Sequence, residues 1–348
     1  MTRIVDLFSD TQTRPTAGMR EAMARAEVGD EQSGSDPTTT ALCARVAKLL
    51  GKEDAVLMPS GTMCNLVSIL VQTRAGDEII VDGTSHIFNT EAASAAAIGG
   101  VSTLALATAD GVFSAAEVEA AIRAPVRTAP RSALVSVENT TAFSGGSVWP
   151  IETVRAVRDV AKRHGLKAHF DGARLLNAVA ATGVSAADYV EGFDSAWIDL
   201  SKGLGCPVGG VLSGSKEFIV EAWRWKYRLG GAMRQSGVLA AAGLYALDHH
   251  IEQLKTDNDN AAALDAGLRK IPGISFEAAT QSNILRFSVE QIGVSAADFA
   301  KACLDKGVRF RATGAYEIRA TTSLEVDAEG VARAIEVARD VLAKLQGG

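Results

Sequence analysis

The sequence predicts an α/β protein made of two parts: a large unit with a doubly wound, mostly parallel sheet, and a smaller α+β unit at the C-terminal end. Three observations predict this class. First, short apolar segments alternate with helical segments along residues 41–227, the order that βα units and parallel sheets produce. Second, this alternation stops after a long helical segment near residue 246. Third, a chain of 348 residues with 47% hydrophobic content can bury one large core and one smaller core.

The large unit, residues 1–245, begins with an arm at residues 1–40 that is rich in loops and contains one predicted helix at 18–26. Strands are predicted at residues 55–58, 78–81, 102–107, 133–137, 167–170, 197–200 and 208–214. Helices are predicted around them at residues 41–50, 65–72, 88–97, 114–123, 151–164 and 216–227. Ligands of such sheets bind where the parallel strands end, so polar residues that follow these strands are the candidates for a site.

The small unit, residues 246–348, begins within a helix predicted from residue 237 to residue 255 or beyond. Its remaining predicted elements are strands at 283–289, 308–312 and 316–321, and helices at 295–306 and 328–345. This order indicates an α+β unit with its own small sheet.

Composition excludes several classes of function. A net charge of −6 leaves no basic surface for nucleic acid. The longest uncharged run, residues 92–109, is interrupted by two glycines, and no membrane span is predicted. The four cysteines are scattered without metal-ligand spacing and the N-terminus lacks an apolar signal segment, so we expect no metal site and a cytoplasmic protein with reduced thiols.

One lysine stands out at the end of a predicted strand. Lys202 follows the apolar segment 197–200 and is followed by three glycines within seven residues. A lysine between packed backbones can lose its solvation, and its amine can then form a Schiff base with a carbonyl. The alternative is a solvated surface lysine, which is the commoner case for a lysine taken alone.

An aspartate strengthens the first interpretation. Asp171 ends the predicted strand 167–170 and precedes Lys202 by 31 residues. An amine and a carboxylate on neighbouring strand ends are what pyridoxal phosphate (PLP) requires: the amine for an imine, and the carboxylate for the pyridinium nitrogen. The sequence therefore predicts PLP as cofactor.

Two further strand ends carry candidates for the same site. Backbone N–H groups and hydroxyls of Ser60, Gly61 and Thr62 open a predicted helix and could hold a phosphate; an ordinary helix cap by Ser60 is the alternative. His86 could stack on a flat heterocycle or relay protons, or it could be a structural histidine. Two arginines, Arg174 and Arg319, could each bind a carboxylate, with surface ion pairs as the alternative.

These residues lie in motifs that resemble a known family. The motifs, in order, are Ser9-Asp10-Thr11, Thr13-Arg14-Pro15-Thr16, Pro59-Ser60-Gly61-Thr62-Met63, His86-Ile87, Glu138-Asn139-Thr140, Asp171-Gly172-Ala173-Arg174-Leu175 and Ser201-Lys202-Gly203-Leu204-Gly205. Together they resemble the L-threonine aldolase family of PLP fold-type I enzymes. The resemblance extends from about residue 6 to residues 229–235, with a weaker match at Ile318-Arg319.

The resemblance implies a lyase that splits a 3-hydroxy-α-amino acid into glycine and an aldehyde. It implies that Lys202 holds PLP, that Asp171 keeps the pyridine nitrogen protonated, and that His86 stacks on the ring. Phosphate ligands would be Ser60, Gly61 and Thr62, and substrate-carboxylate ligands would be Ser9, Arg174 and Arg319. It also implies a homodimer or homotetramer, in which residues 29–40 and 226–234, with Arg234 as a cofactor ligand, come from the neighbouring chain.

Two departures from the family pattern bear on the substrate. The family histidine that contacts the substrate hydroxyl is Thr141 here, and the family tyrosine loop is replaced by Glu31-Gln32-Ser33-Gly34-Ser35. A threonine hydroxyl can orient a β-hydroxyl but cannot act as a base near neutral pH, so the proton would leave through water or His86. The smaller side chains suggest room for a bulky β-substituent, as in phenylserine.

Two other functions remain compatible with the same residues. A β-eliminating lyase or an aminotransferase would share the lysine and the aspartate. A non-catalytic small-molecule binding protein is the third possibility, and retention of Lys202, Asp171 and the phosphate-binding turn together argues against it.

Overall fold

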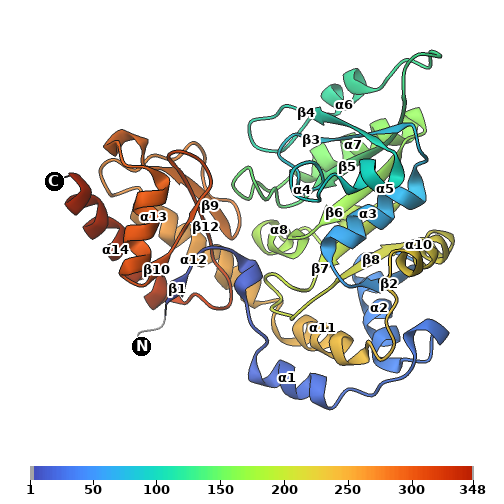
Figure 1. Cartoon of the computed structure of the whole chain (residues 1–348), viewed down its shortest axis with the longest axis horizontal. Helices are drawn as coiled ribbons and strands as arrows, with labels where there is room; N and C mark the ends of the chain where they lie inside the picture. The colour runs from blue at the N-terminus through green and yellow to red at the C-terminus, as the bar shows by residue number, and fades with distance from the viewer. Residues whose placement is uncertain (1–3, 347–348) are drawn as a thin grey trace.

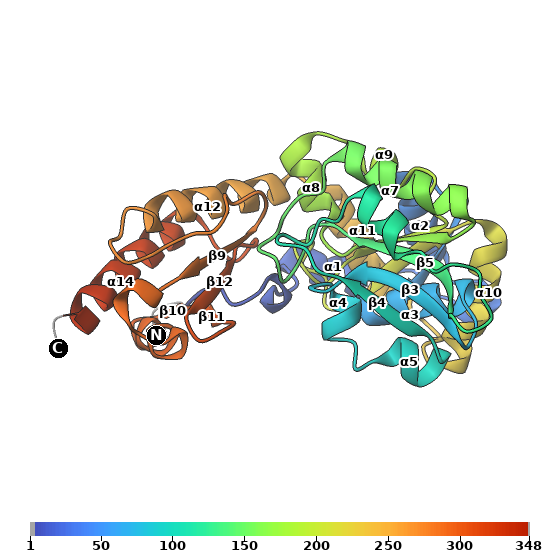
Figure 2. The same cartoon turned by 90° about the horizontal axis from the view of Figure 1, so that it is seen from above.

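The computed structural model describes residues 4–346, which form two bodies side by side (Figures 1 and 2). The larger body contains a seven-stranded sheet in the order β2-β8-β7-β6-β5-β3-β4. Its strands are β2 (Asp54–Met58), β3 (Asp77–Asp82), β4 (Ser102–Leu106), β5 (Arg131–Glu138), β6 (Lys167–Gly172), β7 (Ser195–Asp199) and β8 (Gly210–Gly214). Only β8 runs antiparallel to its neighbours β2 and β7, so the prediction of a mostly parallel sheet is confirmed.

Helices cover both faces of this sheet (Figure 2). One face carries α7 (Ile151–His164) and α9 (Ala186–Val190), and the other carries α3 (Gly61–Gln72), α5 (Ser94–Gly99) and α10 (Lys216–Arg228). The remaining helices of this body are α1 (Ala17–Ala24), α2 (Pro37–Leu49), α4 (His86–Asn89), α6 (Ala115–Ala121), α8 (Leu175–Thr182) and α11 (Gly237–His249). Buried apolar side chains on both faces account for the near-continuous hydrophobic strands that the sequence shows.

The smaller body has a three-stranded antiparallel sheet in the order β11-β12-β9. Its elements are α12 (Gln253–Leu268), β9 (Ile284–Ser288), α13 (Ala296–Asp305), β10 (Val308–Arg309), β11 (Arg311–Ala312), β12 (Glu317–Thr321) and α14 (Ala328–Gln346). Within α12, Leu254 belongs to the apolar cluster of the larger body, whereas Ala261 belongs to that of the smaller body. The two cores therefore meet within α12, and a boundary near residue 246 stays a proposal.

The first described residues pack with the smaller body. The short strand β1 (Val5–Asp6) pairs in parallel with β10, and Leu7 is part of the small-body core. Assignment of the whole arm 1–40 to the large unit does not hold for residues 5–7, because strand pairing across 300 residues of sequence leaves no local signal.

Two predicted helices are interrupted. The helix expected at 237–255 is divided into α11 and α12, and His250 at the break donates its Nδ1–H to the Leu204 carbonyl at 2.8 Å. The helix expected at 88–97 is divided into α4 and α5, because Ala92 and Ala93 adopt φ of 52°. This second break turns the Glu91 side chain into the protein interior, where it is 4% exposed.

The described residues contain neither a membrane-spanning helix nor a cluster of metal ligands. No helix within residues 4–346 is long and apolar enough to cross a membrane. In the same range, no group of three or more His, Cys, Asp or Glu side chains could hold a metal ion.

Candidate active site

The ends of the parallel strands surround one cavity of about 140 Å³. Four strand ends contribute to it, since Glu138 ends β5, Asp171 lies in β6, Asp199 ends β7, and His86 follows β3. The full lining is Thr11, Gly61, Thr62, His86, Glu138, Ala142, Asp171, Ala173, Arg174, Trp197, Asp199, Ser201 and Lys202. The tertiary structure therefore brings Lys202, Asp171, His86, Arg174 and the predicted phosphate-binding turn together.

Lys202 lies just beyond the end of β7 and is largely enclosed. Its side chain is 15% exposed, and its Nζ lies 3.0 Å from Asp199 Oδ2. The same Nζ is 5.8 Å from the centroid of the Trp197 ring. The amine thus points into the cavity with one carboxylate partner, and it is not a surface lysine.

Asp171 is held at the cavity by two N–H groups. Its Oδ2 accepts a hydrogen bond from Asn65 Nδ2 at 2.8 Å, and its Oδ1 accepts one from the Ala173 backbone at 3.0 Å. The residue is 1% exposed. Its carboxylate therefore has a fixed orientation toward the cavity it lines.

His86 has a fixed ring orientation as well. Its Nδ1 lies 2.8 Å from Glu91 Oε1, and its backbone N–H donates to Glu138 Oε2 at 2.6 Å. Burial disfavours the charged imidazole, but the hydrogen bond with Glu91 and the negative charge of Asp171 outweigh it, so the pKa of His86 is raised above its usual value. His86 therefore places a titratable imidazole at the cavity.

Glu138 is a buried carboxyl group inside the same cavity. Its two oxygens accept backbone N–H groups from His86 and Ala142 at 2.6 and 2.7 Å. Burial and the nearby charge of Asp171 raise the pKa of Glu138 to about 7. The side chain therefore changes its charge near neutral pH.

The predicted phosphate-binding turn opens α3. Ser60 caps this helix by accepting the Met63 N–H at 3.2 Å, so the cap interpretation is confirmed, and a twelve-residue helix directs its N-terminal N–H groups at the cavity. Gly61 is required at the turn, because a Cβ there would overlap the Trp197 ring. Gly61 and Thr62 line the cavity, whereas Ser60 is exposed beside it.

The two arginines differ in their partners. Arg174 donates through Nε and one terminal nitrogen to the two oxygens of Asp10, at 2.6 and 2.7 Å, and both side chains are buried. Arg319 is 3% exposed, its Nε has no hydrogen-bond partner among the described residues, and one terminal nitrogen makes a long 3.5 Å contact with the Ala142 carbonyl. Burial and the positive charges of Arg174 and Arg311 lower the pKa of Arg319 to about 9. No described carboxylate forms an ion pair with this guanidinium, and the nearby charge of Asp10 offsets its burial only in part.

Five predicted site residues lie outside the lining of this cavity: Ser60 and Arg319, described above, and Thr141, Ser9 and Arg234. Thr141 is 3% exposed and its hydroxyl accepts the Ser147 N–H at 3.0 Å, a geometry that does not support contact with a substrate hydroxyl. Ser9 is 6% exposed, and its hydroxyl accepts hydrogen bonds from Thr11, which does line the cavity. Arg234 is exposed and pairs with Asp30 at 2.8 Å.

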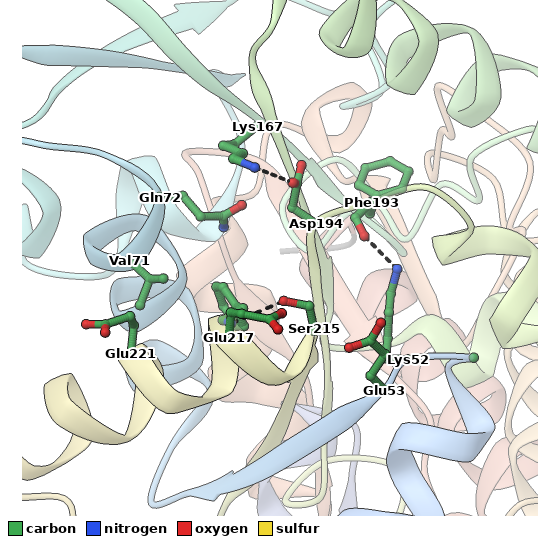
Figure 3. Close-up of a pocket in the computed structure, with 13 residues that line it drawn as sticks. Lys52, Glu53, Val71, Gln72, Lys167, Phe193, Asp194, Ser215, Glu217 and Glu221 are labelled. Atoms are coloured by element: carbon green, nitrogen blue, oxygen red, sulfur yellow. Dashed lines mark hydrogen bonds and ion pairs between the residues drawn. The ribbon is translucent and has the colours of Figure 1, made fainter.

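A wider hollow of about 570 Å³ lies at the opposite end of the strands (Figure 3). The charged side chains there are satisfied locally, since Lys167 pairs with Asp194 at 2.7 Å and Lys52 donates to the carbonyls of Val190 and Phe193 at 2.8 and 2.6 Å. The chemical features of a PLP site are therefore found in the smaller cavity.

Comparisons with known proteins identify the family. The beta-eliminating lyase family model matches residues 6–290. A probable low-specificity L-threonine aldolase of Arabidopsis thaliana is 43% identical over 324 residues, which cover 91% of each chain. The chain belongs to this family. It is a PLP-dependent lyase, and the prediction of the family and of the cofactor from the sequence motifs is confirmed.

Solved structures share the fold. A threonine aldolase structure from Leishmania major superimposes with a TM-score of 0.84 at 22% identity and covers 97% of this chain and 99% of the other. A serine palmitoyltransferase structure described with PLP superimposes with a TM-score of 0.76 at 20% identity, covering 98% and 88% of the two chains. The fold is that of PLP fold-type I enzymes, as predicted.

The residues of this threonine aldolase relative fit the cofactor. The N-terminus of α3 with Gly61 and Thr62, an enclosed amine and a buried carboxylate line one cavity. The sequence motifs did not reveal the polar residues that hold them: Asn65, Glu91, Asp199 and Asp10. Asp10 lies within the first motif and Asp199 two residues before Ser201, so both could have been suspected, but Asn65 and Glu91 lie on a helix interior and in a helix break, where no local pattern marks them.

Proposed function

We propose that this protein cleaves L-3-hydroxy-α-amino acids of the threonine type to glycine and an aldehyde. The observation that carries the proposal is the single cavity in which Lys202, Asp171 and the N-terminus of α3 meet. The kinship with low-specificity L-threonine aldolases supports the same reaction.

When bound, PLP supplies an electron sink for the charge left on the substrate when the Cα–Cβ bond breaks. The residues of this chain would hold it at three points. Lys202 supplies the amine that binds the aldehyde carbon, Asp171 accepts the pyridine N–H, and the N–H groups of Gly61 and Thr62 bind the phosphate. His86, fixed by Glu91, would lie against the ring.

Arg319 would bind the substrate carboxylate. Its buried guanidinium forms no ion pair with a described residue, and the charge of Asp10 only partly offsets its burial; a carboxylate is the group that a guanidinium binds through two hydrogen bonds. Arg174 already donates to both oxygens of Asp10, so its role would be to fix one wall of the site and add positive charge. Ser9 lies next to the lining residue Thr11 and would contribute less than Arg319 to binding of the substrate carboxylate.

His86 would accept the proton from the substrate β-hydroxyl, either directly or through a water molecule. Thr141 is engaged with Ser147 and cannot serve as a base, whereas the imidazole lines the cavity and titrates. Only the neutral ring accepts a proton, so activity should rise with pH through the raised pKa of His86. An unaltered pH–rate profile in His86→Ala would contradict this role.

The substrate is tested with a panel of threonine, allo-threonine and phenylserine, assayed for glycine and for the aldehyde. Equal release of both products supports the proposal, and a preference for phenylserine would support the roomier β-pocket that the small residues at 141 and 33 suggest. Release of ammonia and a 2-oxo acid instead (2-oxobutyrate from threonine or allo-threonine, phenylpyruvate from phenylserine), without glycine, would show a β-eliminating lyase.

We also propose a homodimer or homotetramer in which each site takes residues from a neighbouring chain. Within one chain, residues 29–40 contact residues 226–234, since Lys226 pairs with Glu31 and Arg234 pairs with Asp30. They lie away from the cavity lining of their own chain, so any contact of Arg234 with the cofactor requires a second copy. Sedimentation of the holoenzyme, together with PLP affinity in Arg234→Ala, tests this assembly; cytoplasmic location stays a prediction.

A further inference from the structure

One buried amide contacts both the carboxylate proposed for the pyridine nitrogen and the carboxylate that holds the stacking histidine. Asn65, on α3, is fully buried, and its Nδ2 donates to Asp171 Oδ2 and to Glu91 Oε1, both at 2.8 Å. Glu91 in turn holds His86 through Nδ1. A single side chain therefore touches the acid below the pyridine nitrogen and the carboxylate that orients the stacking imidazole.

The direction of these hydrogen bonds is fixed by their partners. Ionised carboxylates only accept, so the amide nitrogen of Asn65 must face Asp171 and Glu91. Its oxygen then faces the Trp197 Nε1–H at 2.7 Å and His169 Nε2 at 3.0 Å. The indole can only donate, which agrees with this orientation, and Asn65 uses all of its donors.

The hydrogen bonds continue from Asn65 into the sheet through His169 and Ser195. Burial lowers the pKa of His169 to about 3, so this ring is neutral and carries one proton. That proton lies on Nε2, because it faces the Asn65 oxygen, and Nδ1 accepts from the Ser195 hydroxyl at 2.8 Å. Ser195 receives the Gln72 Nε2–H at 2.8 Å, and the amide nitrogen of Gln72 is identified by its bond to the Ser68 carbonyl.

The result is one continuous chain of donors that runs from Gln72 through Ser195, His169 and Asn65 to Asp171. Gln72 lines the hollow at the opposite end of the strands (Figure 3). Reversal of any one bond would bring two donors or two acceptors together, so the chain supports a single arrangement of Asn65.

We propose that Asn65 is a positioning residue that sets the orientation of Asp171 directly and that of His86 through Glu91, so that one amide would fix both the partner of the pyridine nitrogen and the stacking partner of the ring. The proposal rests on the proposed roles of Asp171 and His86 toward PLP. It does not depend on which amino acid is cleaved, and it assigns Asn65 no contact with the substrate.

The test compares Asn65→Ala with the matched variant Asn260→Ala in the PLP-loaded full-length enzyme. Asn260 is also a buried helical asparagine, but its Nδ2 donates to the Val326 carbonyl, remote from the cavity. The first measurement is the dissociation constant of PLP. We expect it to rise roughly tenfold in Asn65→Ala, the effect of losing one hydrogen bond to a charged group, and to stay unchanged in Asn260→Ala.

The second measurement is the pH midpoint at which the absorption of bound PLP changes. We expect this midpoint to move by roughly one pH unit in Asn65→Ala, because Asp171 loses a fixed donor, while a purely structural defect would leave it in place. The charged groups that face the ring are the same in both variants, namely Lys202, His86, Glu91, Glu138, Asp171, Asp199 and Arg174. An unmoved midpoint in Asn65→Ala, or an equal shift in Asn260→Ala, overturns the proposal.

Ser195→Ala gives a second route if Asn65→Ala does not fold. It removes the hydroxyl that donates to His169 and leaves every residue of the cavity lining intact. We expect a midpoint shift in the same direction and of smaller size, and no shift would overturn the proposal. Failure of the proposed function is distinguished from these outcomes, because it appears as absence of glycine release in the unaltered enzyme, whereas the two PLP measurements need no substrate.

Discussion

The two ends of the large sheet differ in how their buried charges are compensated. Glu138, at the carboxyl end of β5, has a pKa of about 7, and Arg319 of β12, whose guanidinium reaches the Ala142 carbonyl beside this end, has an Nε without a partner among the described residues. At the opposite ends lies a hollow with about four times the volume (570 against 140 Å³). There Lys167 pairs with Asp194, and Lys52 donates to two carbonyls. Burial also lowers the pKa of Lys52 to about 8, but its amine has two carbonyl acceptors. A buried donor without a partner and a carboxyl group that titrates near pH 7, and not the size of a hollow, distinguish the site.

The lysines of the two ends give the strongest test of this comparison. Lys202→Ala should lower glycine release at least a thousandfold, because it removes the amine that binds the cofactor covalently, and borohydride should no longer fix PLP to the protein. Lys52→Ala should leave kcat and KM unchanged. Comparable activity of Lys202→Ala and the unaltered enzyme would refute the assignment of the site.

Arg319→Leu separates binding from stability. We expect kcat/KM for the amino acid to fall roughly 10²- to 10³-fold, mainly through KM, because the substrate carboxylate loses its buried cation. Stability of the substrate-free protein should not fall, since an uncompensated charge leaves the interior. The control is Arg174→Leu, which would leave Asp10 buried and unpaired and should lower the free energy of unfolding by about 3–5 kcal/mol; chemical denaturation measures both.

Glu138 predicts a pH dependence of stability. Its pKa is about 7 in the folded protein and near 4.5 when unperturbed, so the folded chain retains a proton that the unfolded chain releases between these values. The free energy of unfolding should therefore fall as pH rises from about 4.5 to about 7, by at most about 3 kcal/mol from this group.

Glu138→Gln is the measurement that isolates this effect. Urea unfolding of both proteins at pH 5 and pH 7, with PLP removed so that ligand binding adds nothing, should give a smaller loss of stability in the variant. Equal slopes would mean that Glu138 does not titrate in this range.

The smallest effect is expected at the opposite end of the sheet. Lys52→Met should lower the free energy of unfolding by about 1–2 kcal/mol, because the carbonyls of Val190 and Phe193 exchange a charged donor for water. Thermal unfolding with glycine release as a second readout checks it. Loss of activity per folded molecule in this variant would contradict the contrast between the two ends.

Local pattern explains which parts of the fold were predictable. Every strand of the large sheet was predicted within a few residues, because strands buried on both faces are apolar throughout and are separated by amphipathic helices. The helix breaks at residues 90–93 and 250–252 were not predicted, since they depend on Glu91 turning inward and on His250 reaching Leu204. The short helices α8 and α9 and the pairing of β1 with β10 were also missed, because they too depend on contacts made in the tertiary structure.

The sequence by itself determined the fold class, the family and the cofactor, because strand periodicity and the motifs around Lys202, Asp171 and Gly61 are local properties of the chain. Only the tertiary structure decided that Arg174 is bound by Asp10 while Arg319 has an open guanidinium, that Thr141 is engaged elsewhere, and that Asn65 joins Asp171 to Glu91. Except for the contact of Thr141 with Ser147, six residues away, those facts depend on burial and on hydrogen-bond partners more than 25 residues apart in sequence, and the order of the residues along the chain does not encode which buried polar groups find a partner.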